Sequence, residues 1–393
     1  MNSVEEALAR CLALTAILPV QSVPLRKAAG RVLAEPAQAR LTQPPFDASA
    51  MDGYALAQAG AVGATYTVIG EAGAGHGFAG VLAPGQATRI FTGAPLPQGA
   101  VTVALQEHVK ADGTAITLTE AAAKGDNIRP RGQDFAEGQP LPAPRLLRPN
   151  DVALLAAMNV AEVQVRRRPV VAIMATGDEL VMPGEAPRPD QIIASNNFAI
   201  AAMVEAAGAE ARMLPIARDN EADLRTVFGL TEGADLIVTI GGASVGDHDL
   251  VGKVAADLGL ERAFWKIAMR PGKPLMAGRV LGIPMLGLPG NPVSAIVCAH
   301  LFLLPMLKAM LGLPDPAPQV QRARLGSDQP ANGVRAHYMR ARLALSDGIP
   351  TITPFDRQDS ALLSILTEAD ALLIRPIDDP ARKAGEMMDF IAI

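Results

Sequence analysis

The chain has 393 residues, of which 49% are apolar and 4% aromatic, so several domains with largely aliphatic cores are expected. Its formal net charge of −5 gives no electrostatic reason to expect nucleic-acid binding. The two cysteines, Cys11 and Cys298, exclude a disulfide framework and a four-cysteine zinc site, and they fit a reducing compartment. The first residues include two glutamates and no basic stretch, so no signal peptide is expected, and no apolar run has the length of a membrane span. We therefore expect a cytoplasmic protein without a membrane partner.

The N-terminal part of the sequence predicts a helix followed by a small β domain. Residues 3–17 have apolar side chains at helical spacing, and Pro19 is expected to end this helix. Glycine and proline then recur between short β-rich runs over residues 41–140, a pattern that is typical of an all-β domain. A proline-rich stretch at 140–151 indicates a domain boundary, and it leads into a short helix that ends at Asn159.

The second half of the sequence predicts an α/β domain over residues 166–313 and a β-barrel over residues 318–393. Apolar strand-like runs, the first at 168–176, alternate with amphipathic helices, which indicates a mostly parallel sheet with both faces covered. A long apolar run near residue 300 contains histidine, proline and lysine, so we interpret it as a buried helix. A proline-rich linker then separates this domain from β-like runs that predict a small C-terminal barrel.

The turn after the third strand, TIGGASVGDHD, is the strongest candidate site. Gly241, Gly242 and Gly246 let backbone N–H groups approach an anion, Ser244 adds a hydroxyl, and the following helix start favours negative charge. Asp247 and Asp249 would repel a phosphate unless a divalent cation lay between them, so the turn implies Mg²⁺. The alternative is a tight strand-to-helix turn with a capping aspartate.

Three further segments of the α/β domain carry candidate binding residues. The turn ATGDEL places Glu179 at the end of the first strand, either as a metal ligand or as a solvated charge. The segment LPGNPVSA suits a helix start, with Asn291 as the N-cap and Ser294 in the first turn, and such a start either only caps the helix or also binds an anion. The segment WKIAMRPGKPL carries Lys266, Arg270 and Lys273, which suit a tetrahedral oxyanion or form a basic surface loop.

The β domain contributes three candidate turns. PPFDASAMDGYA carries Asp52, TGAPLPQGA carries Thr92, and RPRGQD carries Asp134. In isolation each is more typical of turn chemistry than of a functional site. The five histidines lack the spacing of a zinc site, and no nucleophile elbow, Walker lysine loop or HExxH motif is present.

The six segments PPFDASAMDGYA, TGAPLPQGA, ATGDEL, GGASVGDHD, RPGKP and LPGNPVSA together resemble the molybdopterin molybdenumtransferase family, which includes the E domain of gephyrin. The resemblance covers nearly the whole chain. It implies a homodimer of elongated four-domain subunits, in which the β domain of one subunit faces the α/β domain of the other. The implied domains are a linker domain of residues 1–41 and 139–165, a β-rich domain of 42–138, an α/β molybdopterin-binding domain of 166–313, and a barrel of 318–393.

The resemblance also implies a reaction: molybdate is inserted into adenylylated molybdopterin with Mg²⁺, and AMP and molybdenum cofactor are released. Residues that match catalytic positions of the family are Asp52, Thr92, Asp134, Glu179, Asp219 and Asp249. Residues expected to bind substrate are Gly241, Gly242, Ser244, Gly246, Asp247, Lys266, Arg270, Lys273, Pro289, Asn291, Ser294, Arg340 and Ser360. Those expected to bind the metal are Glu179, Asp247 and Asp249. Within this set, the molybdate pocket of the family maps onto Arg270, Lys273, Ser294, Arg340 and Ser360.

Three other functions were weighed. A molybdopterin adenylyltransferase shares the α/β domain but lacks the flanking β domains, so residues 41–140 argue against it. A gephyrin-like scaffold would tolerate the loss of the carboxylates, which are all present here. A pterin carrier without turnover would release no AMP. The upstream adenylyltransferase and the chaperones of downstream molybdoenzymes are expected as further protein partners.

Overall fold

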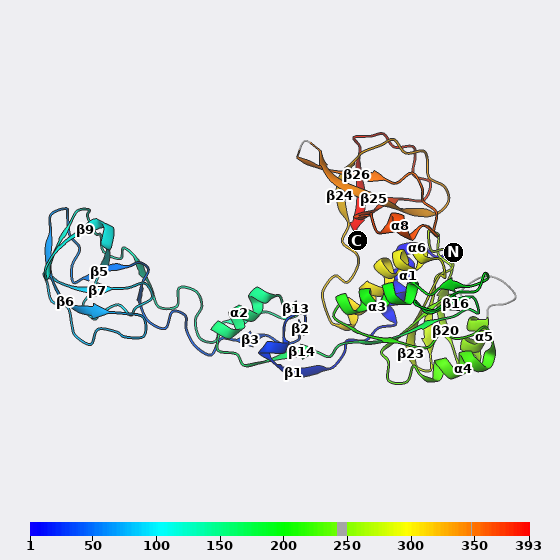
Figure 1. The fold of residues 1–393 in the computed structure, drawn as a ribbon, viewed down its shortest axis with the longest axis horizontal. Helices are drawn as coiled ribbons and strands as arrows, with labels where there is room; N and C mark the ends of the chain where they lie inside the picture. The colour runs from blue at the N-terminus through cyan, green and yellow to red at the C-terminus, as the bar shows by residue number, and fades with distance from the viewer. Residues whose placement is uncertain (242–249, 347) are drawn as a thin grey trace.

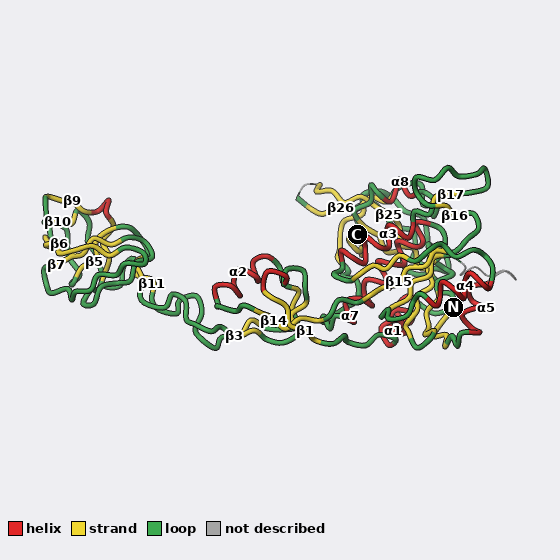
Figure 2. Tube along the Cα trace, turned by 60° about the horizontal axis from the view of Figure 1, so that its bottom comes forward, coloured by secondary structure: helices red, strands yellow, loops and turns green. Residues whose placement is uncertain are grey.

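The computed structural model describes residues 1–241, 250–346 and 348–393. Figure 1 shows an elongated molecule with a β domain at one end, a slender linker unit in the middle, and an α/β unit with a barrel above it at the other end. A second view keeps the same separation (Figure 2). The β domain and the α/β unit, at opposite ends of the molecule, are therefore joined only through the linker unit.

The linker unit is built from chain segments on both sides of the β domain. Its four-stranded antiparallel sheet has the order β1-β14-β2-β13, and β3 pairs with β12 beside it. The elements are β1 Val20–Pro24, β2 Val32–Leu33, β3 Ala37–Gln38, β12 Pro140–Leu141, β13 Arg145–Leu146, α2 Pro149–Ala157 and β14 Glu162–Arg166, with a 3-10 turn at Leu25–Lys27. Leu33, Leu155 and Val165 are fully buried in its small core. Because β3 and β12 pair, the β domain is an insertion whose two ends leave the linker unit side by side.

The β domain confirms the all-β expectation. Its sheet has the order β8-β5-β7-β6-β10-β9, and β4 pairs with β11 next to the linker. The strands are β4 Ala48–Ser49, β5 Gly53–Leu56, β6 Thr65–Ala72, β7 Gln86–Ile90, β8 Thr102–Leu105, β9 Val109–Asp112, β10 Ala115–Leu118 and β11 Ile128–Arg129, with a 3-10 turn at Gln106–His108. Two separate clusters of buried side chains, one around Leu56 and Tyr66 and one around Ile90 and Val103, form its core.

The α/β unit contains a six-stranded sheet in the order β18-β15-β19-β23-β22-β20. The strands are β15 Val170–Ala175, β18 Glu210–Met213, β19 Leu236–Ile240, β20 Glu261–Trp265, β22 Met276–Val280 and β23 Ile283–Leu288, and a separate short pair is β16 Leu180–Val181 with β17 Ile192–Ile193. The first four strands of the order are parallel, as expected. Strand β22 is antiparallel to both of its neighbours, β23 and β20. It forms a tight hairpin with β23, in which Val280 pairs with Ile283. The sheet is therefore mixed at one edge.

Helices cover both faces of this sheet. Alternate residues of β19 divide between two cores: Leu236 and Val238 pack with one set of helices, and Ile237 packs with the other. The first set comprises α1 Val4–Ala13, α3 Asn196–Ala206, α6 Pro292–Cys298 and α7 Leu304–Met310, and the second comprises α4 Glu221–Gly229 and α5 Leu250–Asp257. This alternation is what strands that are apolar throughout require.

Two helices differ from the simplest expectation. Helix α1 begins with a Ser3–Glu6 capping box and ends at Ala13, so the helical pattern of residues 3–17 extended beyond the helix. The reason is local: the Leu14 N–H bonds back to the Cys11 carbonyl, and the chain then extends so that the Leu18 N–H reaches the Met310 carbonyl. The expected helix near residue 300 runs from Pro292 to Met310 with a π-helical turn at Ala299–Leu303. Its 19 residues are apolar enough to span a membrane, but 72% of that stretch is buried inside the protein, as suits a core helix.

The C-terminal residues form the expected barrel. Its strands are β24 Gln321–Leu325, β25 Ala336–Ser346, β26 Ile349–Pro354, β27 Ala371–Arg375 and β28 Met387–Ala392, with the short helix α8 Leu363–Leu366. The order β25-β26-β24-β28-β27 closes through pairing of β25 with β27. Strand β21 (Met269–Arg270) leaves the α/β unit and pairs with β25, with Arg270 opposite His337. This pairing fixes the barrel against the α/β unit.

Candidate active site

A cavity of about 650 Å³ lies at the carboxyl ends of the parallel strands. The residues that line it and were expected from the sequence are Glu179, Asp219, Gly241, Pro289 and Asn291. Strand register explains why they meet: Ala175 pairs with Ile240, and Ile240 pairs with Leu288, so three strands end at one level of the sheet. The turns that follow these strands therefore open into the same space, which is where open α/β sheets bind ligands.

The turn after β19 needs glycine at its first position. Gly241 has a φ of +90°, and a Cβ atom there would lie 2.9 Å from the Thr176 carbonyl oxygen of the neighbouring turn. Side chains other than hydrogen are excluded at that contact. The remaining residues expected at this turn, Gly242, Ser244, Gly246, Asp247 and Asp249, lie outside the described residues.

Three carboxylates gather at one side of the cavity. Asp178 Oδ1 accepts a hydrogen bond from the Asp219 backbone N–H at 3.1 Å, and Glu179 follows in the same turn. Loss of hydration in the cavity, and then the charges of Asp178 and Glu179, raise the pKa of Asp219. Within the described ranges no group of three or more His, Cys, Asp or Glu side chains has the arrangement of a complete metal site. Among the described residues these three carboxylates form no ion pair, although the Arg218 guanidinium donates to the Asp178 and Leu180 carbonyls of the same turn.

Sequence reasoning missed several cavity residues. Thr176 and Asn197 are 5% and 3% exposed, and their side-chain oxygens have no hydrogen-bond partner among the described residues. Ile192 and Ile193 of β17 form an apolar part of the cavity wall. They are 59% and 37% exposed, respectively. The asparagine-rich start of α3 was the one available signal in the sequence, because Ser195, Asn196 and Asn197 at this helix start line the cavity.

The basic segment after β20 lies beside the cavity, but its three cations have different surroundings. Lys266 has its ammonium 3.9 Å from the centre of the Trp265 ring, a cation–π contact. Arg270 donates from Nη2 to Asn332 Oδ1 of the barrel at 2.9 Å, and burial and then Arg335 and Arg375 lower its pKa. Lys273 is exposed, and its neighbour Pro274 lines the cavity. None of the three expected cations lines the cavity: Lys266 contacts Trp265, Arg270 contacts Asn332, and Lys273 is next to the lining residue Pro274.

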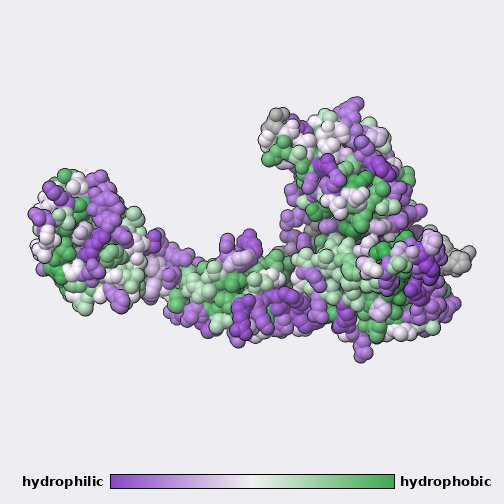
Figure 3. Space-filling view, in the orientation of Figure 1, coloured by the Kyte–Doolittle hydropathy of each residue, from purple (hydrophilic) through white to green (hydrophobic). Residues whose placement is uncertain are grey.

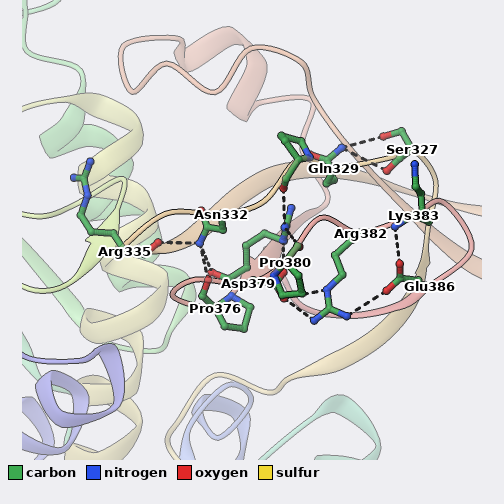
Figure 4. A network of polar contacts seen from close by, with 12 residues as sticks. Ser327, Gln329, Asn332, Arg335, Pro376, Asp379, Pro380, Arg382, Lys383 and Glu386 are labelled. Atoms are coloured by element: carbon green, nitrogen blue, oxygen red, sulfur yellow. Dashed lines mark hydrogen bonds and ion pairs between the residues drawn. The ribbon is translucent and has the colours of Figure 1, made fainter.

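Asn332 connects this segment to an ion-pair network in the barrel (Figure 4). Its side-chain nitrogen donates to the carbonyls of Arg335, Arg375 and Pro376. The Arg375 side chain in turn pairs with Asp379 at 2.5 Å, and both side chains are about as buried as the core, at 3% and 2% exposed. Arg270 is thus held by an asparagine whose own position is fixed.

The start of α6 joins the cavity to the barrel. Asn291 is the N-cap residue and Pro292 is the first helical residue, as expected, but the Asn291 side chain makes no capping bond. It donates instead to Ser360 Oγ at 3.1 Å, and the Val293 N–H donates to the Ser360 carbonyl at 3.1 Å. Ser294 is buried in the first turn of the helix, and Arg340 is buried in β25. Expected residues from two domains, Asn291 and Ser360, are therefore in direct contact.

The three expected residues of the β domain form a second, separate site. Asp52 Oδ1 accepts hydrogen bonds from both the N–H and the hydroxyl of Thr92, each at 2.7 Å. These two bonds lower the pKa of Asp52. Asp134 lines a cavity of about 500 Å³ together with Gly93, the residue after Thr92. Figures 1 and 2 place this domain at the opposite end of the molecule from the α/β unit. A single chain therefore does not bring the expected residues of the β domain to the cavity of the α/β unit.

Comparison with known proteins covers all parts of the chain. Three family models match it: the MoeA N-terminal region (domain I and II) at residues 2–159, a probable molybdopterin binding domain at 172–309, and the MoeA C-terminal region (domain IV) at 322–393. A crystal structure of the molybdopterin biosynthesis moeA protein from Pyrococcus horikoshii OT3 superposes with a TM-score of 0.84 at 28% identity, over 100% of both chains.

Curated relatives match over similar lengths. A molybdopterin molybdenumtransferase of Nostoc sp. is 35% identical over 93% of this chain and 86% of its own length. Molybdopterin molybdenumtransferase 2 of Mycobacterium tuberculosis is 35% identical over 93% of both chains. The molybdopterin molybdenumtransferase of Staphylococcus aureus is 30% identical over 99% of this chain and 94% of its own length. The chain therefore belongs to the MoeA family of molybdopterin molybdenumtransferases.

Proposed function

We propose that the chain transfers molybdenum from molybdate to adenylylated molybdopterin and releases AMP and molybdenum cofactor. Family membership makes it a transferase of molybdenum cofactor biosynthesis. The observation that carries the finer proposal is the cavity at the ends of β15, β19 and β23, where the carboxylates of Glu179 and Asp219 meet the starts of α3 and α6. These groups suit a substrate that joins a phosphate-bearing pterin to a nucleotide, with a tetrahedral oxyanion beside it.

The nucleophiles of the transfer come from the dithiolene of the substrate. Cys11 and Cys298 are fully buried, and burial raises the pKa of both thiols, that of Cys11 to about 12. A buried neutral thiol is a poor nucleophile and metal ligand. The protein's task is therefore to bind, orient and neutralise charge rather than to supply sulfur.

Glu179, with Asp247 and Asp249 of the neighbouring turn, is the proposed Mg²⁺ site. Glu179 and Asp219 fit the cation, because they are oxygen donors in the cavity, where lost hydration and then the charges of Asp178 and Glu179 raise the pKa of Asp219. When bound, Mg²⁺ supplies a positive charge that neutralises the phosphoanhydride as AMP leaves. Glu179 and Asp219 then hold that charge in the cavity, and the Gly241 turn binds the phosphate through its backbone.

Molybdate is proposed to bind where the α/β unit meets the barrel, at Arg270, Lys273, Ser294, Arg340 and Ser360. The contacts from Arg270 to Asn332, and from Asn291 and Val293 to Ser360, support this placement because each of them joins the α/β unit to the barrel. Cations and N–H or O–H donors are what a tetrahedral dianion requires.

A homodimer is proposed to complete the site. Asp52, Thr92 and Asp134 are distant from the cavity within one chain, so the β domain of the partner subunit has to supply them. Figure 3 shows apolar surface along the linker unit. Val20 and Leu146 of this unit are 37% and 47% exposed. Exposed apolar side chains of this kind suit a subunit interface. The upstream adenylyltransferase and downstream chaperones remain predicted partners.

The direct test is AMP release from the purified protein with adenylylated molybdopterin and Mg²⁺, with and without molybdate. We expect release that depends on both molybdate and Mg²⁺. Tight binding of adenylylated molybdopterin without any release would contradict the proposal and favour a carrier. AMP formation that needs ATP and free molybdopterin instead would favour an adenylyltransferase.

A further inference from the structure

Arg340 is the largest fully buried side chain in the described protein, at 1% exposed. Its guanidinium donates to oxygens of the segment that follows β26: Nη1 to the Leu362 carbonyl at 3.1 Å and Nη2 to the Arg357 carbonyl at 3.3 Å. Its Nε donates to Gln358 Oε1 at 3.4 Å. The charge is therefore surrounded by neutral acceptors from residues 357–362, which we call the 357–362 segment.

The described residues include no carboxylate that forms an ion pair with Arg340. Burial lowers the pKa of Arg340, and only the charge of Asp359 opposes this shift. The same barrel shows the usual solution at Arg375, whose equally buried guanidinium pairs with the Asp379 carboxylate (Figure 4). Arg340 is therefore held by neutral acceptors and by the charge of Asp359, without the direct ion pair that Arg375 has.

Gln358 occupies the position where a carboxylate would be expected. Its Oε1 accepts from the Arg340 backbone N–H at 3.0 Å as well as from Nε, and its Nε2 donates to the carbonyls of Arg340 at 3.0 Å and Phe355 at 2.8 Å. All of these hydrogen bonds of the Gln358 amide are made with Arg340 or with Phe355. The side chain thus fixes the guanidinium without adding negative charge.

The 357–362 segment also reaches the cavity. Ser360 contacts Asn291 and Val293 at the start of α6, and Ala361 lines the cavity wall. The segment that accepts hydrogen bonds from Arg340 therefore also contacts the place where the two domains meet.

We propose that Gln358 is a positioning residue for the oxyanion substrate, which orients the Arg340 guanidinium without forming an ion pair with it. This inference rests on the proposed function, because it assigns the anion to molybdate. A glutamate at the same position would have the same shape but would neutralise Arg340, so the amide rather than the acid is the functional choice.

The experiment compares Gln358→Glu with the wild-type protein in two assays: calorimetric binding of molybdate alone, and AMP release with each substrate varied. We expect Gln358→Glu to raise the KM and the dissociation constant for molybdate about tenfold or more, because an internal ion pair competes with the anion. The KM for adenylylated molybdopterin is expected to stay within about twofold, because charge is added only next to Arg340.

Two further variants separate charge from structure. Gln358→Met keeps the length of the side chain but adds no charge, and we expect a smaller rise in the molybdate KM, about threefold. Gln319→Glu adds a carboxylate at an exposed position of the linker before the barrel, and no change is expected. An equal or larger effect of Gln358→Met, or an unchanged molybdate KM in Gln358→Glu, would overturn the inference.

Failure of the underlying function gives a different result. If the wild-type protein binds molybdate but releases no AMP, the transferase proposal fails, while the calorimetric comparison still tests Gln358. Parallel loss of binding for both substrates together with a lower melting temperature in Gln358→Glu and Gln358→Met would show a purely structural role and overturn the inference.

Discussion

In the β domain Asp52 accepts two hydrogen bonds of 2.7 Å from Thr92. In the α/β cavity the Asp219 side chain forms no ion pair among the described residues, and it lies beside Asp178 and Glu179. The pKa of Asp52 is lowered by its hydrogen bonds, and the pKa of Asp219 is raised by lost hydration and neighbouring charge. The β domain therefore carries a carboxylate that already accepts two hydrogen bonds, and the α/β cavity carries carboxylates without an ion-pair partner among the described residues.

This difference indicates that the β domain and the α/β unit have different roles in the site. A satisfied carboxylate is rigid and can act as a preorganised acceptor for a substrate group. An unsatisfied cluster gains stability only when a cation or a substrate neutralises it. We infer that the α/β cavity binds the charged part of the substrate, and that the β domain completes the site with groups that are fixed before binding.

The largest effect is expected from Glu179→Gln, which removes a cavity carboxylate. We expect AMP release to fall about a hundredfold or more, because a ligand of the proposed Mg²⁺ site is lost. The measurement is the rate of molybdate-dependent AMP release at saturating Mg²⁺. Glu232→Gln, an exposed glutamate in the turn before β19, is the matched control and should retain wild-type activity. Equal activity of Glu179→Gln and this control would remove the cavity from the account.

The independence of the two ends can be tested with Gly53→Ala in β5. A Cβ atom there would lie 1.9 Å from the Ala104 carbonyl oxygen of the paired strand, so the β domain has to distort. We expect its unfolding free energy to fall by about 2–4 kcal/mol, while molybdate binding to the α/β unit is retained. Gly73→Ala, which meets nothing within 4 Å, is the control in the same domain. Loss of molybdate binding in Gly53→Ala would show that the two ends are not independent.

Asp52→Asn tests the satisfied carboxylate with a smaller expected effect. The amide can still accept from Thr92 but has no charge, and we expect AMP release to fall about tenfold. Because the folded-state pKa of Asp52 is lowered, its hydrogen bonds stabilise the fold above its ordinary pKa, and that contribution disappears as the pH falls through the lowered value. Thr92→Val is expected to move the acid limb of the activity profile to higher pH. An unmoved acid limb would mean that Thr92 does not set the ionisation of Asp52.

The smallest effect is expected from Asp219→Asn on stability without Mg²⁺. The folded-state pKa of Asp219 is raised, so the folded protein binds its proton more tightly than the unfolded chain does, and stability falls as the pH rises through that window. Removing the charge should raise the melting temperature at neutral pH by about 1–2 °C. A melting temperature that decreases at neutral pH but not at pH 4 would reverse the sign and contradict the counter-charge argument.

The sequence predicts one of the two regions better than the other. Glycine, asparagine and acidic residues directly after apolar strand runs identified Glu179, Gly241, Pro289 and Asn291, because parallel strands end at one edge of a sheet. The oxygens of Thr176 and Asn197 were missed, because their lack of partners appears only when the strands and α3 are packed. The cation–π contact of Lys266 with Trp265 depends on a local backbone conformation, with a φ of +66°, that a basic motif does not indicate.

The β domain shows what such reasoning does not reach. Asp52, Thr92 and Asp134 could be selected from their turns and from the family resemblance, and two of them are in contact. Their separation from the cavity depends on the linker unit, in which β3 pairs with β12 and carries the β domain away from the α/β unit. That long-range pairing of two-residue strands leaves almost no pattern in the sequence.

The central claim is that each complete site combines the β domain of one subunit with the α/β cavity of the other, and mixed dimers test it most directly. An Asp52→Asn, Asp134→Asn double variant and a Glu179→Gln variant would be mixed in equal amounts, allowed to exchange subunits, and assayed for molybdate-dependent AMP release. If the site is shared, half of the dimers contain one intact site of two, and about a quarter of the wild-type activity should return. If the mixture is no more active than its separate components although the subunits have exchanged, each site lies within one chain and the account is wrong.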